Sequence, residues 1–335
     1  MRRWTILALM AFMLIMAAVA GVAGADSKNS NEPDLVAYTT LPPETVLILA
    51  QAYERATHVR ISFVPLPARD LLEKLSTERT ADVILTDSEV LKTAAGMNQL
   101  TPHISETNDA VKNDFKDERD RWIGVWYDPI IFCANKDYLR TLYEIPDTWN
   151  GLATARKVRI GITDFLAADA SSNLMFQLIE NLGETATYEI LDGIHPKVVQ
   201  YTKFLSNPVR QAGMGEADIS IAVESETLRY IQDNYPLKII YPADGTSYIL
   251  TGVGITATDS KKVRAAENFA DWLLTDDAHI ALQSNGFYFI STNPGTLAYK
   301  TFAGKNLVLF DRAQNFTAQQ REEFLDRWVT EVRLK

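Results

Sequence analysis

The sequence predicts an α/β fold of two lobes, each a mostly parallel sheet flanked by helices. Short apolar segments alternate with amphipathic ones from residue 35 onward, which is typical of βαβ units. The 335 residues exceed what one hydrophobic core usually fills. Two long β-type segments, 122–135 and 247–257, are suited to cross between the lobes.

The first 25 residues have the three parts of a secretory signal peptide. Two arginines precede an apolar run from 6 to 19, and small residues end at Ala25. We expect cleavage after about Ala25 and export to a bacterial periplasm. An uncleaved anchor is disfavoured because the run is at the short end for spanning a bilayer. No direct membrane anchor is expected, since no cysteine directly follows the cleavage site to carry a lipid.

The remaining chain is acidic and nearly free of cysteine. Removing Arg2 and Arg3 lowers the basic count from 33 to 31, against 43 acidic residues. That excess argues against nucleic acid or an anionic membrane as partner, but it does not decide the charge of a small ligand. Cys133 is the only cysteine, so no disulfide can form within one chain, and its apolar neighbours predict a buried structural thiol.

The first lobe has a βαβαβ order, which builds a parallel sheet whose strand ends gather along one edge. We expect strands at 35–38, 59–65 and 81–85 and helices at 43–56, 68–79 and 89–95. In the long segment 122–135, Asp128-Pro129 is expected to break the strand into a pair. In the other long segment, Gly252 and Gly254 indicate bends or close backbone approach.

The second lobe repeats the alternation, and a serine of Ser171-Ser172 is a plausible N-cap for its first helix. We expect strands at 158–162, 219–223 and 238–241 and helices at 174–182, 198–205 and 225–234 in this lobe. After the return crossing, further helices are expected at 262–274, 278–285 and 317–332. We therefore assign 26–127 plus 252–310 to lobe 1, 128–251 to lobe 2, and 311–335 to a C-terminal helix that packs on the lobes.

No pattern in the sequence indicates an enzyme. The G-x-S-x-G, H-E-x-x-H and Walker patterns are absent, and no G-x-G-x-x-G stands between a strand and a helix. The four histidines lie far apart, without metal-ligand spacing. We therefore expect no catalytic residues, no resident metal and no cofactor.

Hydroxyl and carboxylate side chains recur instead where strands meet helices. Ligands of open α/β sheets bind outside the carboxyl ends of the strands, so several of these side chains could line one cleft. Ordinary helix capping uses the same residue types and is the alternative for most of them. For Thr39-Thr40, which stand between the first strand and a Pro-Pro helix start, ligand contact is favoured. The other positions are Thr86, Asp87, Ser88, Tyr127, Asp128, Ser171, Ser172 and Asn173.

Several segments match one known family in their order along the chain. They are LVAYTTLPPETVLILAQAYERAT, TADVILTDSEVLKTAAGMNQLTPH, IPDTWNGL, GEADISIAVESE, YPADGTSYILTGVGIT and AAENFADWLLTDDAHIALQSNGFY. From about 34 to 292 the chain resembles the periplasmic solute-binding proteins of ABC importers, in the branch of ferric-ion and phosphonate binders. The resemblance implies a type II binding-protein fold that closes on a ligand in the interlobe cleft by hinge bending. It also implies a monomer that docks on an inner-membrane ABC permease with its ATPase.

The resemblance further implies which residues contact the ligand. From the first lobe these are Thr39, Thr40, Thr86, Asp87 and Ser88. The second lobe would contribute Ser171, Ser172 and Asn173, and Glu224 is a further cleft position. Apart from the resemblance, we also expect Asp128 and Tyr248 to contact the ligand.

These donors suggest the class of ligand. Hydroxyls and helix amino ends suit phosphate, phosphonate or carboxylate groups, so we expect a phosphonate or a phosphorylated organic compound. A carboxylate such as Asp128 or Glu224 could then hold an amine or sugar hydroxyls on the same ligand.

A ferric-ion binder of the same fold is the first alternative. Ferric binders of this branch typically use adjacent tyrosines near the strand that here ends in Val223 and Glu224, and the chain has no Tyr-Tyr pair. Tyr230, Tyr235 and Tyr248 nevertheless lie near in sequence, so the metal alternative stays open. A ligand-sensing module for a receptor kinase is the other alternative.

Overall fold

The computed structural model describes residues 34–78, 80–256, 259–303, 306–312 and 314–335. The signal peptide expected at 1–25 lies outside the described residues and stays a prediction. In the part of the chain that is described, none of the helices combines the length and the apolar character that crossing a membrane requires.

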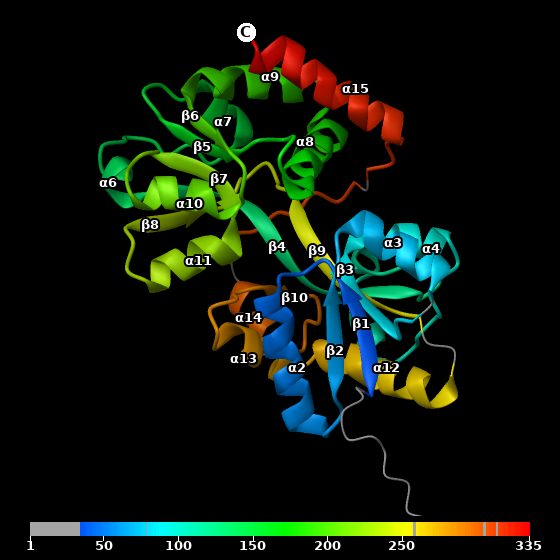
Figure 1. Ribbon diagram of the computed structural model, residues 1–335. Helices are drawn as coiled ribbons and strands as arrows, with labels where there is room; N and C mark the ends of the chain where they lie inside the picture. Colours follow the sequence, from blue (N-terminus) through cyan, green and yellow to red (C-terminus); the bar gives the residue numbers. More distant parts are fainter. Residues whose placement is uncertain (1–33, 79, 257–258, 304–305, 313) are drawn as a thin grey trace, which may run out of the picture. The chain divides into compact units, whose positions relative to one another are not determined.

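Within the described residues, one mixed sheet of ten strands runs through the molecule in the order β2-β1-β3-β9-β4-β7-β5-β6, with β10 and β8 also pairing β4 (Figure 1). Its two ends are parallel, whereas β9 and β4 in the middle are antiparallel to their neighbours. The strands are β1 (Leu35–Thr39), β2 (Ile61–Pro65), β3 (Val83–Asp87), β4 (Trp122–Asn135), β5 (Ile160–Thr163), β6 (Val198–Thr202), β7 (Ile219–Val223), β8 (Leu237–Ile240), β9 (Tyr248–Ile255) and β10 (Ile290–Ser291).

Helices flank this sheet and link its strands. The α-helices are α2 (Pro43–Thr57), α3 (Ala68–Thr77), α4 (Ser88–Gly96), α5 (Glu106–Asp109), α6 (Lys136–Leu139), α7 (Trp149–Thr154), α8 (Asp169–Leu182), α9 (Glu184–Ile194), α10 (Ser206–Gly213), α11 (Glu224–Gln232), α12 (Ser260–Leu273), α13 (Asp276–Gln283), α14 (Leu297–Ala303) and α15 (Ala318–Trp328). Two 3₁₀ turns, η1 (Asn113–Phe115) and η2 (His195–Lys197), and a π-helical turn, η3 (Val329–Arg333), complete the set.

Two hydrophobic cores lie along the sheet. The first core holds buried side chains of β1, β3, α2, α4, α12 and the amino-terminal half of β4. The second core holds those of β5, β7, α7, α8, α9, the carboxyl-terminal half of β4 and the end of α15. Each fully buried aliphatic or aromatic side chain contributes about 1.5 to 3 kcal/mol. The lobe boundaries given above stay predictions.

A smaller cluster on the other face of β4 contains Cys133. The thiol is buried and unpaired, as expected, and burial raises the pKa of Cys133 to about 12. C-terminal helix α15 packs on the second core through Phe324, Leu325 and Trp328, and the Tyr188 hydroxyl donates to the carbonyl of Phe324 at 2.8 Å.

The expected break at Asp128-Pro129 is wrong, because β4 is one strand of 14 residues. The N–H of Ile130 points to β9 and bonds the carbonyl of Ser247 at 2.9 Å, so the nitrogen of Pro129 faces the opposite side. On that side the ladder with β7 begins only at Ile130. Proline therefore removes no ladder hydrogen bond at this place, and the strand continues through it.

Two further expectations in the second half are wrong. Residues 198–202 form strand β6 rather than a helix, because β-branched Val198 and Val199 pair in a parallel ladder with β5. Helix α8 begins at Asp169, so Ser171 and Ser172 lie inside it and neither is its N-cap. The expected close backbone approach at Gly252 is confirmed: a Cβ there would lie 2.5 Å from the carbonyl oxygen of Ile123.

Candidate functional site

A cleft of about 1540 Å³ is the candidate binding site. One wall is the start of α4 with residues 112–118, and the opposite wall is the first turns of α8. The first residues of β9 and the segment 307–326, which includes the start of α15, complete the lining. Strand ends and helix starts from both cores therefore meet at one space, as expected for open α/β sheets.

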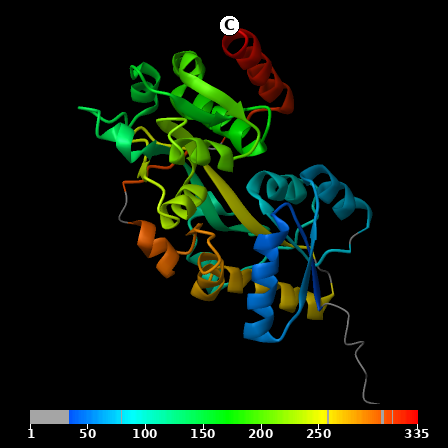
Figure 2. The ribbon, with the colours of Figure 1, turned by 60° about the vertical axis from the view of Figure 1, so that its left-hand side comes forward.

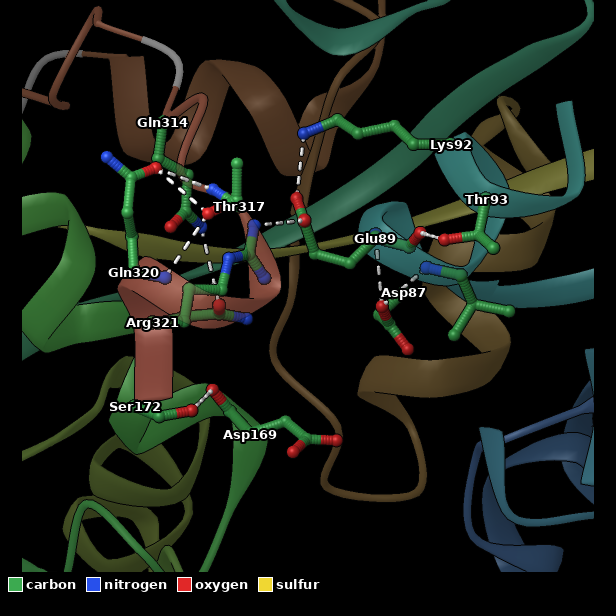
Figure 3. Close-up of polar contacts among 12 residues, drawn as sticks. Asp87, Glu89, Lys92, Thr93, Asp169, Ser172, Gln314, Thr317, Gln320 and Arg321 are labelled. Atoms are coloured by element: carbon green, nitrogen blue, oxygen red, sulfur yellow. Dashed lines mark hydrogen bonds and ion pairs between the residues drawn. The ribbon is translucent and has the colours of Figure 1, made fainter. Parts of the chain in front are cut away.

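At the α4 wall, Asp87 and Ser88 both line the cleft. Asp87 is the N-cap of α4, since its Oδ1 accepts from the N–H groups of Glu89 and Val90 at 3.0 and 3.1 Å (Figure 3). Burial raises the pKa of Asp87, and these two N–H bonds oppose that shift. Its Oδ2 accepts from the hydroxyl of Thr86 at 3.4 Å. Asp87 thus caps a helix and also lines the cleft, so the capping and ligand interpretations are compatible here.

Three threonines expected at this wall do not line the cleft. Thr39 is fully buried, and its Oγ1 accepts from the N–H of Leu41 at 3.0 Å. The hydroxyls of Thr40 and Thr86 lie 2.7 Å apart and bond each other. The side-chain to backbone bond of Thr39 stabilises the turn that leads from β1 into α2, a structural role that such bonds commonly have. The bond between the two hydroxyls connects this turn to β3.

The α8 wall presents an uncapped helix start. The N-cap position is Ala168, whose side chain has no acceptor, and Asp169 and Ala170 line the cleft directly after it. Ser172 and Asn173 line the cleft as well, and Ser172 donates to the carbonyl of Asp169 at 3.0 Å. The N–H groups of Ser171 and Ser172 bond the carbonyl of Ala168 at 3.0 and 3.1 Å, so the N–H groups without an acceptor within the helix are those of the cleft-lining Asp169 and Ala170.

Ser171 does not share that wall. It is buried and lines a separate small cavity between α8 and the sheet. Its Oγ has no hydrogen-bond partner among the described residues. The helical period explains the separation, since consecutive residues of a helix point in different directions.

Asp128 and Glu224 also lie away from the cleft. Asp128 accepts from the N–H and the hydroxyl of Ser225 at 2.9 and 2.5 Å, and burial raises the pKa of Asp128 to about 7. Glu224 is fully buried and accepts from the hydroxyl of Tyr241 at 2.6 Å. Asp128 thus connects β4 to the start of α11, and Glu224 connects the start of α11 to the residue that follows β8.

The alternation of β4 places Tyr127 on the cleft side and Asp128 on the other side. Tyr127 meets Tyr248 of β9 with ring centroids 5.8 Å apart, and Phe115 stacks on Tyr127 at 5.2 Å. Tyr299 of α14 lines the same space. Burial raises the pKa of Tyr127, and it raises the pKa of Tyr248 to about 12, so both phenols are neutral at ordinary pH.

The C-terminal segment contributes side chains that we did not expect to line the site. Arg312, Gln314 and Arg321 line the cleft, and Gln314 donates to the Oδ1 of Asn173 at 3.3 Å. Figure 3 shows the side chain of Arg321 pointing toward Glu89 at the start of α4, with Gln314 close to Thr317. No local pattern marks these residues, because the amphipathic tail is equally suited to packing alone.

Carboxylates outnumber cations around the cleft, nine to five. Lys92 and Arg321 both pair with Glu89, whereas in the described part of the chain neither Lys112 nor Arg312 forms an ion pair. The site therefore suits a ligand with an anionic group and further hydroxyl or amine groups better than a bare anion. Among the described residues, no three His, Cys, Asp or Glu side chains are grouped to hold a metal ion.

This chain is similar in sequence to a known protein family and to a protein of known sequence. The profile of a family described as bacterial extracellular solute-binding protein matches residues 35–288. An uncharacterised protein of Haemophilus influenzae is 26% identical over 315 residues, which cover 90% of this chain and 91% of that protein.

Two solved structures are similar to this chain in fold. The periplasmic binding protein AfuA from Actinobacillus pleuropneumoniae, with fructose 6-phosphate bound, has a TM-score of 0.68 and 22% identity, covering 90% of this chain and 99% of AfuA. Iron-bound HitA from Pseudomonas aeruginosa has a TM-score of 0.73 and 17% identity, covering 87% of this chain and 98% of HitA. These likenesses show the type II periplasmic binding-protein fold that the sequence predicts.

Proposed function

We propose a ligand class for this chain, which belongs to the family of bacterial extracellular solute-binding proteins. Membership implies a small-molecule ligand and an ABC permease partner. We infer that the protein works in the periplasm as a monomer and captures a small organic compound with a phosphoryl or phosphonate group and a second polar end.

The uncapped start of α8 is the observation that carries this proposal. The N–H groups of Asp169 and Ala170, which have no acceptor within the helix, and the positive end of the helix dipole favour an anion beside Ala170. Arg312 lines the same cleft without an ion pair in the described residues, and a guanidinium can bind a phosphoryl group through two parallel hydrogen bonds. The neighbouring carboxylate of Asp169 then favours a ligand that also carries donors.

The rest of the cleft suits such donors. The Asp87 carboxylate and the Asn173 side chain provide acceptors on opposite walls, and the rings of Tyr127 and Tyr248 offer an apolar surface between them. A sugar phosphate combines all three features, and the similar protein AfuA has fructose 6-phosphate bound. This support concerns the class of ligand and not one compound.

Iron is the second candidate because three tyrosines from β4, β9 and α14 line the cleft. Tyr127 and Tyr248 are in ring contact, and Tyr299 lies near enough to influence the pKa of Tyr127. Phenolate oxygens suit a hard cation, and the similar protein HitA is iron-bound. Their raised pKa means that a ferric ion would first have to displace the phenol protons. Tyr230, in contrast, packs on Tyr235 and does not line the cleft.

Titration calorimetry of refolded, ligand-free protein separates the two candidates. We expect heat with fructose 6-phosphate or aminoethylphosphonate, and a loss of about 10- to 150-fold in affinity for Arg312→Gln, since hydrogen bonds to a charged group contribute about 1.5 to 3 kcal/mol. Arg140→Gln, the same change in an exposed ion pair outside the cleft, is the control. No heat with any phosphorylated compound, together with a visible iron band that Tyr248→Phe abolishes, would establish the iron alternative.

A further inference from the structure

Arg321 of α15 reaches Glu89 of α4 across the cleft. Its Nη2 lies 3.2 Å from the Oε2 of Glu89 (Figure 3). Helix α4 packs in the first core through Val90 and Leu91, whereas α15 packs on the second core. The ion pair therefore connects the two cores through side chains, separately from the strands that cross between them.

The surroundings of the pair hold it in place. The guanidinium of Arg321 lies over the ring of Phe176 at 5.5 Å, and Phe176 is part of the second core. The ammonium group of Lys92 donates to the other carboxylate oxygen of Glu89 at 2.7 Å. Burial alone would raise the pKa of Glu89, but Lys92 and Arg321 together lower it. Both side chains of the pair are 29% exposed, so solvent screens this pair less than a fully exposed one.

The pair is placed where it can restrain motion. Strands β4 and β9 carry the chain between the cores, and Figures 1 and 2 both show α4 and α15 together on one side of these strands. Rotation about the crossing strands would separate α4 from α15 when the cleft widens. A contact far from a rotation axis resists opening more effectively than one beside it.

We propose that Arg321 and Glu89 form a latch that limits how far the cleft opens in the ligand-free protein. Helix α15 lies outside residues 35–288, which match the family profile. The latch holds the cleft walls near their binding distance before any ligand arrives. Part of the conformational cost of binding is thereby met in advance.

The latch is tested by measuring a distance between the two halves without ligand. Spin labels at Glu73→Cys on α3 and Glu189→Cys on α9 report that distance, because both positions are exposed. The native Cys133 is fully buried and stays unlabelled. Pulsed electron resonance then gives the distribution of distances in ligand-free protein.

We expect Arg321→Gln to shift the distribution toward longer distances, with the wider form gaining about two- to fivefold in population, the range expected for one partly exposed ion pair. The exchange of charges in Glu89→Arg with Arg321→Glu should return the distribution toward that of the wild type. High salt should widen the wild-type distribution and leave Arg321→Gln unchanged.

Arg327→Gln is the matched control. It makes the same change on the same helix, but Arg327 pairs with Glu184 and Glu331, which both lie on the second-core side. An unchanged distribution in Arg321→Gln, or an equal shift in Arg327→Gln, overturns the latch. Since no ligand is added, failure of the latch says nothing about the proposed ligand class, and failure of the ligand titrations says nothing about the latch.

Discussion

Replacing Asp128 by asparagine should make the protein more stable at high pH relative to the wild type. Burial, with smaller contributions from Glu224 and Glu226, raises the pKa of Asp128 from 3.8 to about 7, against the opposing bonds from Ser225. An asparagine can accept from the N–H of Ser225 and donate to its hydroxyl, so the local bonding survives the change. Only the cost of burying a charge is removed.

The magnitude follows from proton linkage. Since the folded pKa of Asp128 lies above the unfolded pKa, its contribution to stability is complete below the unfolded pKa and is lost as the pH rises through the folded pKa. The full loss above about pH 7 is about 4 kcal/mol, at 1.36 kcal/mol per pKa unit. Between about pH 5 and about pH 8 the loss is about 2 to 3 kcal/mol.

Urea unfolding of both proteins at these two pH values measures the effect. The stability of Asp128→Asn minus that of the wild type should rise by about 2 to 3 kcal/mol from the lower to the higher pH. Asp137→Asn, which removes a carboxylate at an exposed ion pair, is the control. A difference that stays flat with pH for Asp128→Asn would refute the argument that burial of this charge is costly.

Two further predictions concern buried positions. Burial lowers the pKa of His279 to about 4 from 6.5, so the folded protein excludes a proton that the unfolded chain binds as the pH falls below 6.5. Between about pH 7.5 and about pH 5 the free energy of unfolding of the wild type should therefore fall by about 2 kcal/mol more than that of His279→Gln. Acid unfolding of the two proteins at the same pH would contradict this. Gly252→Ala should lower the free energy of unfolding, measured by urea, by about 1 to 3 kcal/mol, because its Cβ would lie 2.5 Å from the carbonyl oxygen of Ile123. Gly96→Ala, where nothing lies within 4 Å of the added carbon, should stay within about 0.5 kcal/mol of wild type.

The candidate site could be predicted only in part from the sequence. The junctions of strands and helices pointed to the right region, although the start of α8 was placed too late, and five of the eleven residues expected to contact the ligand line the cleft. The sequence could not distinguish neighbours along one element, because Tyr127 and Asp128, or Ser171 and Ser172, differ only in the direction that the pleat or the helix gives them. The five that line the cleft are Asp87, Ser88, Ser172, Asn173 and Tyr248.

The sequence by itself determined the alternation of strands and helices, the family, the buried Cys133 and the close approach at Gly252, because periodicity, glycine and apolar runs are local properties. Only the tertiary structure decided that β4 passes through Pro129 unbroken and that Arg321 faces Glu89 across the cleft. Both depend on partners far away in the chain: the ladder that β7 begins one residue later, and a helix that starts 229 residues after Glu89. Long-range pairing of this kind leaves no periodic trace in either segment.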